Sequence, residues 1–329
     1  MSAAPMSAPA RFAGQRGRAD RLGDQILYGL TAGASLLVVG AIALIIYQLI
    51  DGAAPAISLY DIGFLGHNVW NPVLDNQQGV FGAAAFIYGT AITSAIALAL
   101  GGPIGIAIGL FLSLLAPRRV TAVIGPLIEL IAAIPSVVLG LWGILILAPV
   151  MHSTIEPVLH DVLGWIPIFG DASPTGLGVF TAGIVLTIMV VPIIASISRE
   201  LFGSVSNELR EGALALGTTR WEMVRGIVLS STRPGITATM ILGLSRALGE
   251  AIAVTQVIGG GSASIISGNF FNNGDTIASR IANDFLGPQS NRETAALFYL
   301  AVILLVFGLA ANLAAQLIVR RYDLAHRTR

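Results

Sequence analysis

Two residues of opposite charge, Arg246 and Glu250, stand four positions apart in a stretch that is otherwise apolar. Residues at this spacing share one face of an α-helix, so the two side chains can form an ion pair or line a shared polar route. An ionised group inside a membrane is costly unless it is paired or hydrated, and it is therefore a functional candidate. The guanidinium of Arg246 offers a fixed fork of donors that matches the oxygens of an oxyanion. We interpret the pair as part of an anion pathway in which Glu250 keeps the resting site neutral; a purely structural ion pair is the alternative.

Two further polar residues, Glu129 and Ser136, lie in an earlier apolar stretch. Glu129 follows Arg119 by ten residues, or about 15 Å along a helix, which puts it near the membrane edge, where it can bond to a loop. Ser136 follows Pro135, and a proline inside a membrane helix frees a backbone carbonyl that needs a partner. Both are candidate pathway residues, and for Glu129 we favour the loop contact.

Residues 211–230, EGALALGTTRWEMVRGIVLS, interrupt the apolar pattern with charged and turn-forming residues. Gly217 stands where a left-handed helix C-cap is expected, and Thr219 and Glu222 have the spacing of a capping box. The segment is therefore predicted to form two short helices joined at Gly217. Aromatic and arginine anchors contribute much of the energy of protein interfaces, so Trp221 favours docking to another protein. An amphipathic turn on the membrane surface is the alternative.

Membrane helices must position these residues, because the composition is that of an integral membrane protein. Hydrophobic residues make up 55% of the chain and charged residues 11%, whereas about 25% is usual in soluble domains. The absence of cysteine excludes disulfides and thiolate metal sites. A membrane-spanning helix needs about 20 apolar residues. We expect an all-α polytopic membrane protein with six transmembrane helices, at roughly 26–50, 82–114, 124–150, 176–198, 234–259 and 293–319.

The arginines are unevenly distributed between the connecting loops. Fifteen of the 18 basic residues fall in the N-terminal segment, the tail and the connections after the second and fourth spans, while the opposite loops hold Arg280 and Arg292. Cytoplasmic loops retain basic residues, so both termini are expected in the cytoplasm. The predicted organisation is a disordered arginine-rich arm, a six-helix domain and a cytoplasmic tail, at 1–24, 25–320 and 321–329.

The loop at 260–292, on the outer side in this topology, has a second amphipathic pattern. Ile277, Ile281 and Phe285 recur every four residues after Thr276. This spacing predicts a short helix at the outer mouth of the protein.

The segment 211–230 resembles the EAA loop through which permeases of ABC importers contact their ATPase. The family pattern is Glu-Ala-Ala, three residues, Gly, nine residues and Ile-x-Leu-Pro. Gly212 replaces an alanine, which loosens the helix by at most about 1 kcal/mol, and Ser230 replaces the proline. The resemblance implies a MetI-like permease fold with a coupling loop at about 201–232. Its matching residues are Glu211, Gly212, Ala213, Gly217, Ile227 and Leu229.

Three further stretches, at 129–149, 243–260 and 274–285, resemble the PstC permease subunits of phosphate ABC importers. The related PstA subunits share the Arg-Ala-x-Gly-Glu element but continue with Thr-Ala-Pro, where this chain has Ala-Ile-Ala. The resemblance implies a multi-pass protein of the bacterial plasma membrane that forms a phosphate pathway with a PstA-like permease. It also implies two copies of a PstB-like cytoplasmic ATPase, which bind ATP and Mg, and an external PstS-like phosphate-binding protein.

Other classes of function find less support in the residues. An ion-driven secondary transporter needs several carboxylates around a cation, and the predicted spans offer only two plausible acids, Glu129 and Glu250. A membrane hydrolase needs a histidine or paired-aspartate constellation inside the spans, which the sequence lacks. No P-loop is present either, so we expect no ATP hydrolysis in this chain. We also expect no cofactor, no metal site and no nucleic-acid partner. A permease for another oxyanion, such as molybdate or sulfate, is the nearest alternative. Metal-ligand spacing is absent among the four histidines, His67, His152, His160 and His326.

Overall fold

The computed structural model describes residues 18–73, 79–260 and 266–327, and the chain divides after Gln48 into two units. Helix α1 (Arg18–Tyr60) runs through the end of the first unit and into the second. It already covers residues 18–24 of the predicted disordered arm, because that stretch contains no proline; the rest of the arm, 1–17, lies outside the described residues. The predicted tail is likewise helical as far as Arg327, since no glycine or proline follows Gly308 to end α15 (Asn291–Arg327).

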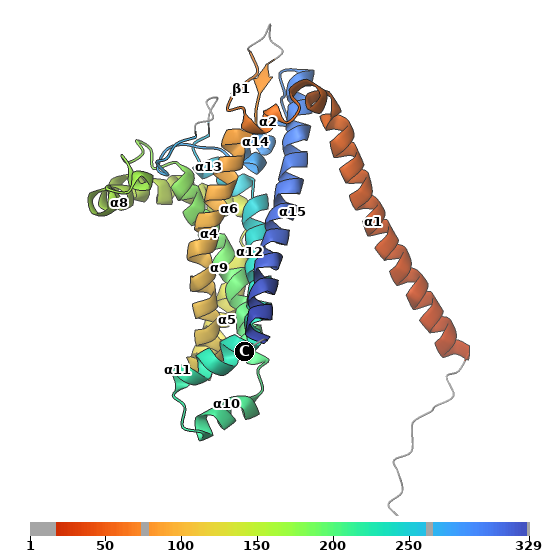
Figure 1. The fold of residues 1–329 in the computed structure, drawn as a ribbon, viewed down its shortest axis with the longest axis vertical. Helices are drawn as coiled ribbons and strands as arrows, with labels where there is room; N and C mark the ends of the chain where they lie inside the picture. Colours follow the sequence, from red (N-terminus) through yellow and green to blue (C-terminus); the bar gives the residue numbers. More distant parts are fainter. Residues whose placement is uncertain (1–17, 74–78, 261–265, 328–329) are drawn as a thin grey trace, which may run out of the picture. The chain divides into compact units, whose positions relative to one another are not determined.

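The second unit is almost wholly helical (Figure 1). Its one described sheet is an antiparallel pair of two-residue strands, β1 (Trp70–Asn71) and β2 (Val80–Phe81). Its short helices near this pair are α2 (Gly63–Gly66) and α14 (Ile277–Asp284). The elements before the fourth span are α4 (Ala84–Leu110), η1 (Phe111–Leu115), α5 (Arg118–Ala132), α6 (Ser136–Trp142), η2 (Gly143–Leu147), α7 (Ala148–Val150), η3 (Met151–Ile155), α8 (Glu156–Leu163) and η4 (Pro167–Phe169). The remaining ones are α9 (Val179–Gly203), α10 (Asn207–Ala215), α11 (Arg220–Met223), η5 (Val224–Val228), α12 (Leu229–Gly249) and α13 (Ile252–Val257).

Six helices in the described residues are long and apolar enough to cross a membrane, as the sequence predicts. They comprise α1, α4 with η1, α6 to α8, α9, α11 to α12, and α15. Five of these helical segments belong wholly to the second unit, where α4, α9, α12 and α15 run side by side (Figure 1).

The core of the second unit is centred on α9, which packs against α4, α12 and α13. Three glycines of α4 follow each other at every fourth position, Gly101, Gly105 and Gly109, and face α9. A Cβ atom at Gly105 would lie 2.8 Å from the Cβ of Ile194. Small residues at this spacing let two helix backbones approach closely, which drives helix association in lipid.

The third span begins later than expected. The sequence predicts one helix at 124–150, but the chain turns at Ala133 and Ile134, and the spanning helix runs from Ser136 to Leu163. Pro135, with ψ of 137°, is extended, and proline disfavours helical conformation in the residue before it. Helix α5 is therefore a separate element that packs on α9.

The fifth span differs from the expected 234–259 at both ends. Its helix starts at Arg220, inside the predicted coupling loop, and continues without interruption through η5 and α12 to Gly249. At Glu250 the backbone becomes extended, with ψ of 120°, and a new helix, α13, starts at Ile252. The second of the two short helices predicted for the loop is thus the first part of a transmembrane helix.

The second unit has two distinct ends, which we call the α14 end and the α10 end. At the α14 end, Phe64, Trp70, Phe81 and Phe86 pack with residues of α14 and α15. At the α10 end, a smaller apolar cluster joins α10, η5 and the end of α9 around Phe202. The arginine distribution predicts that the α10 end faces the cytoplasm.

A cysteine-labelling experiment tests this orientation, because the chain has no native cysteine. Leu286, 93% exposed, lies beyond α14, and Ser204, also exposed, lies between α9 and α10. We expect a membrane-impermeant thiol reagent to label Leu286→Cys in intact cells and Ser204→Cys only after permeabilisation. The opposite pattern would invert the topology.

Candidate functional site

Helix α12 carries Arg246 in its last turn, and its neighbours leave this side chain partly open. On one side of α12, Gly243 packs so closely on α9 that a Cβ there would lie 3.0 Å from atoms of Val190 and Ile194. The Arg246 side chain is 42% exposed and lies about 60° around the helix from Gly243, beside this contact. A fixed positive charge is therefore presented on a surface that the described helices of this chain do not cover.

The structure brings Arg246 and Glu250 together, but not as two residues of one helix. Arg246 Nη2 lies 4.0 Å from Glu250 Oε2, at the limit of an ion pair. Because α12 ends at Gly249, Glu250 lies in the break between two helices, which corrects the expectation of a shared helical face. Its other oxygen, Oε1, accepts a hydrogen bond of 3.4 Å from the Ala253 backbone N–H at the start of α13.

This geometry leaves Glu250 well buried and Arg246 accessible. The Glu250 side chain is 10% exposed and is held both by the guanidinium and by the α13 backbone. The carbonyl end of α12 adds a partial negative charge near Arg246. The site can therefore hold a positive charge in place and still offer guanidinium donors to an incoming anion.

The other two candidate pathway residues lie apart from each other. Ser136 is half-buried at the start of α6, a helix that packs against α13; a Cβ at Gly140 would lie 2.9 Å from Ala253 Cα. Glu129 instead pairs with Arg199 of α9, with Oε1 and Nη1 3.9 Å apart. Its partner belongs to a helix and not to a loop, and this pair joins α5 to α9 away from the helix break.

The predicted coupling loop is built around a left-handed residue. Gly217 has φ of +84°, and its N–H donates to the Leu214 carbonyl at 3.0 Å while the Thr218 N–H reaches the Ala213 carbonyl at 3.4 Å. These two bonds form a Schellman motif that ends α10. The Thr219–Glu222 capping box then starts α11, so both predicted signals are confirmed.

The residues of the loop divide into buried and exposed sets. Ala213 is buried in the apolar cluster at the α10 end, with Ile227 and Leu229 packed against that cluster. Trp221 is 65% exposed, and Glu211 and Gly212 are also exposed. A groove of about 470 Å³ runs between α10 and η5, with Glu208 and Glu222 in its lining and no side chain at Gly212 or Gly226. The loop therefore presents an aromatic anchor beside an open, partly acidic groove.

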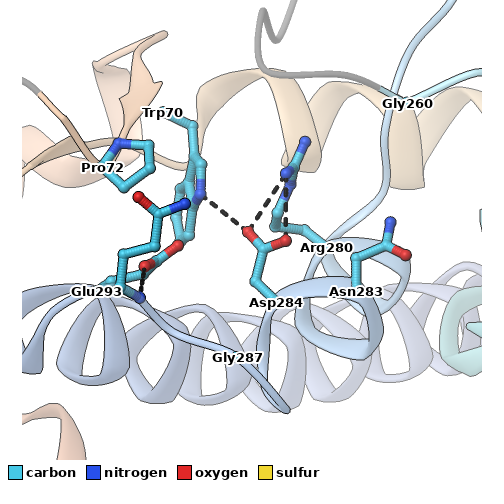
Figure 2. A pocket seen from close by; sticks show the side chains of 9 residues that line it. Trp70, Pro72, Gly260, Arg280, Asn283, Asp284, Gly287 and Glu293 are labelled. Carbon is cyan, nitrogen blue, oxygen red and sulfur yellow. Dashed lines mark hydrogen bonds and ion pairs between the residues drawn. The ribbon is translucent and has the colours of Figure 1, made fainter.

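A second polar cluster, which sequence reasoning missed, lies at the α14 end. Figure 2 shows the Asp284 carboxylate between the indole of Trp70 and the guanidinium of Arg280. Trp70 Nε1 donates to Asp284 Oδ2 at 3.1 Å, and Arg280 Nη1 lies 3.3 Å from the same oxygen. Arg280 Nη2 also pairs with Asp275 Oδ2 at 2.6 Å. The i,i+4 spacing of Arg280 and Asp284 within the predicted outer helix was the available signal.

We call Asp275, Arg280 and Asp284 the Arg280 cluster. Its opposite charges compensate each other where they are buried among aromatic rings. The Arg280 Cζ atom lies 5.2 Å from the ring centroid of Phe86 and 5.9 Å from that of Trp70. Burial raises the pKa of the Asp275 carboxyl, and the opposing effect of the Arg280 charge is smaller. Since both acids share one guanidinium, the cluster fastens the β1–β2 pair to α14 instead of offering free donors to an anion.

Comparison with known proteins adds independent information. A family profile described as "Binding-protein-dependent transport system inner membrane component" matches residues 101–324. Similar curated proteins include two called "Phosphate transport system permease protein PstC". The one from Mesorhizobium japonicum is 38% identical and covers 92% of this chain and 91% of its own. The one from Xylella fastidiosa is 40% identical and covers 87% of this chain and 89% of its own. "Phosphate transport system permease protein PstC 2" of Mycobacterium tuberculosis is 37% identical, with 95% and 97% covered.

Solved structures with a similar fold are also transporters. A bacterial alginate ABC transporter in complex with an alginate-bound periplasmic protein aligns with TM-score 0.58 and 18% identity, over 93% of this chain and 99% of its own. An inward-facing MetNI methionine ABC transporter aligns with TM-score 0.51 and 19% identity, over 72% of this chain and 95% of its own. At these identities the likeness concerns the fold, and it confirms the predicted MetI-like architecture.

Removing the guanidinium of Arg280 should destabilise the α14 end. Arg280→Met keeps an unbranched aliphatic stem but leaves Asp275 buried without its counter-charge, so we expect the free energy of unfolding to fall by about 3–5 kcal/mol. Asn283→Ala, at an exposed residue that lines a cavity of about 320 Å³ together with Arg280 and Asp284, is the matched control and should change the free energy of unfolding by less than about 0.5 kcal/mol. Denaturant unfolding of both variants in detergent measures the difference. Equal stability of the two variants would show that the cluster does not hold this end together.

Proposed function

Because the chain belongs to the family of binding-protein-dependent transport system inner membrane components, and within it to the PstC permease proteins, we propose that it is the permease subunit of an ATP-driven phosphate importer. It is a multi-pass protein of the bacterial plasma membrane. The observation that supports phosphate chemistry most directly is the accessible Arg246 guanidinium beside a break in a transmembrane helix.

Arg246 supplies the positive field that an anion needs inside the bilayer. Its donors form a planar fork that can contact two phosphate oxygens at once. At 4.0 Å the ion pair with Glu250 is loose, and the Glu250 carboxylate has a second partner in the α13 backbone. An incoming phosphate can therefore take up guanidinium donors without first stripping Glu250 of all its contacts.

Glu250 limits how tightly that phosphate is held. Conduction requires that an ion enter a site and also leave it, and a strong isolated positive charge would act as a trap. The Glu250 carboxylate lies in the helix break, 4.0 Å from the Arg246 guanidinium, so it repels the anion from the position where the attraction is greatest. The pair thereby provides attraction and release at one place.

The surfaces of the chain fit the partners expected of such an importer. The uncovered face of α12 that bears Arg246 would meet a homologous permease, so that the pathway lies between the two subunits. Trp221 and the groove between α10 and η5 would contact a cytoplasmic ATPase, present in two copies, which binds ATP and Mg. An external phosphate-binding protein would deliver its ligand at the α14 end. No step of this scheme requires a cofactor or metal in the chain itself.

Two alternative functions fit the described pairs of charged residues to different degrees. A permease for molybdate or sulfate would have the same arrangement of Arg246, because all these oxyanions accept bidentate hydrogen bonds. An ion-driven secondary transporter would need a cation site, and the pairing of Glu250 with Arg246 and of Glu129 with Arg199 leaves both acids neutralised.

Arg246→Gln tests the pathway. The amide removes the fixed charge but is less costly to bury than an ion, so the subunit should still insert while uptake of labelled phosphate falls at least about a hundredfold. Glu250→Gln should lower the rate through tighter anion binding. The measurement uses cells that lack other phosphate importers, with the membrane level of the subunit determined in parallel.

The charge-exchanged variant, Arg246→Glu with Glu250→Arg, is the matched control. A structural ion pair tolerates exchange, whereas an anion pathway does not, because the exposed position would then carry a negative charge. Normal uptake by Arg246→Gln, or by the exchanged pair, would remove Arg246 from the pathway.

The docking surface is tested at Gly217 and Trp221. A Cβ at Gly217 would meet no atom within 4 Å, so a substitution there acts through the positive φ alone. Gly217→Val should weaken ATPase binding at least about tenfold, while Gly217→Asn, which tolerates a left-handed conformation, should stay within about threefold of the native chain. Trp221→Ala should weaken binding without altering the fold.

Co-purification of the ATPase with the tagged chain, scaled to the amount of permease, measures all three variants. Unchanged ATPase recovery with both Gly217→Val and Trp221→Ala would mean that the ATPase binds elsewhere.

A further inference from the structure

A polar contact joins α12 to α15 one residue before Arg246. The hydroxyl of Ser245 donates to Asn312 Oδ1 at 3.0 Å, and its oxygen also lies 2.9 Å from the carbonyl oxygen of Ile241 one turn earlier. The contact holds in either orientation of the Asn312 amide, because with the amide turned its Nδ2 donates to the Ser245 oxygen. Both side chains are half-buried between the two helices.

Asn312 is a polar residue in a strongly apolar transmembrane helix. It lies in a span whose mean hydropathy reaches 2.5, with exposed Leu309 and Leu313 close to it in the sequence. An asparagine in a membrane helix is unfavourable unless another helix satisfies its amide, and interhelical hydrogen bonds of this kind fix how two helices pack. Ser245 is the described partner of Asn312 on α12. The Asn312 amide therefore favours one orientation of α12 about its own axis relative to α15.

The helical positions around Ser245 show what this rotation controls. Successive residues of an α-helix are about 100° apart. Gly243 faces α9, Ser245 faces α15 at about 200° from it, and Arg246 lies about 100° beyond Ser245 on the uncovered face, together with the exposed Leu242. Helix α12 is therefore held on two nearly opposite sides, by close packing at Gly243 and by the polar contact at Ser245. The direction of Arg246 follows from these two contacts.

We propose that Asn312 is a positioning residue for the transport site: through Ser245 it fixes the rotation of α12 and thereby directs Arg246 toward the open face. The proposal rests on the proposed function of Arg246, and it assigns a role to a residue of the last span, outside the helix that carries Arg246. Without the amide, α12 keeps its packing on α9 but loses its restraint on the α15 side. Arg246 then samples directions in which it no longer faces the anion.

Reactivity of a cysteine introduced at position 246 measures this direction independently of transport. In the cysteine-free chain, Arg246→Cys is introduced alone, with Asn312→Leu, or with Ser245→Ala, and the complex is treated in membrane vesicles with a charged methanethiosulfonate reagent. We expect Asn312→Leu and Ser245→Ala each to change the reaction rate of the introduced thiol by about threefold to tenfold, the range expected for one interhelical hydrogen bond in a membrane. The variant Ser204→Cys, between α9 and α10, is the control and should react at an unchanged rate.

The exchanged pair, Ser245→Asn with Asn312→Ser, restores a hydrogen-bonding partner on each helix. It should bring the reaction rate of the thiol at position 246 back toward the rate measured with the native pair. In chains that retain Arg246, Asn312→Leu should lower the maximal rate of phosphate uptake by about threefold to tenfold and leave KM unchanged, since an external binding protein would capture the substrate. The exchange should restore the rate.

Three results would overturn the proposal: the same thiol reaction rate at position 246 with and without the amide, no reaction of Arg246→Cys in any chain, or a loss of uptake that matches loss of the protein. The cysteine measurement does not depend on which anion is carried. If the native complex failed to transport phosphate while the change in thiol reaction rate persisted, the proposed substrate would be wrong and the positioning role would stand.

Discussion

The close packing of α4 on α9 is the interaction on which the rest of the structure depends. Inside a bilayer there is no hydrophobic force between helices, so helices associate through close contact and polar bonds. Gly105 and Gly109 bring the two backbones together; a Cβ at Gly109 would lie 2.9 Å from the Ala195 carbonyl oxygen. Helix α9 also receives α12 at Gly243, through Val190 and the same Ile194 that contacts Gly105. The position of Arg246 thus depends on glycines far from it in the sequence.

The same requirement explains three pairs of polar residues in the described helices. Glu129 with Arg199 and Ser245 with Asn312 each join two helices, whereas Arg246 with Glu250 spans the end of one helix and the break that follows it. The first two contacts connect neighbouring helices. The third lies at a break in a transmembrane helix, and this position separates a candidate transport site from the architectural contacts, since the side chains of Arg199 and Arg246 are similarly exposed, at 36% and 42%.

Much of the fold could be predicted from the sequence, because a membrane span and a helix cap are local signals. The apolar stretches predict the number of spans, and Gly217 predicts the hinge of the loop. Helix breaks were less predictable: Pro103 and Pro192 lie within continuous helices, and Pro135 stands where the helix is interrupted. All three lack an N–H group, and neighbouring helices decide whether the freed carbonyl is satisfied. For the same reason the contact of Trp70 with Asp284 and the partner of Asn312 were not visible in the sequence, since they come from distant segments.

The central claim is that this chain forms the phosphate pathway of an ATP-driven importer. The most direct measurement is accumulation of labelled phosphate by vesicles containing the purified complex, with the binding protein outside and ATP supplied at the ATPase side. The account predicts accumulation that requires ATP, persists when ion gradients are collapsed and is unaffected by excess sulfate or molybdate. Accumulation that follows an ion gradient without ATP, or that sulfate or molybdate abolishes, would contradict it.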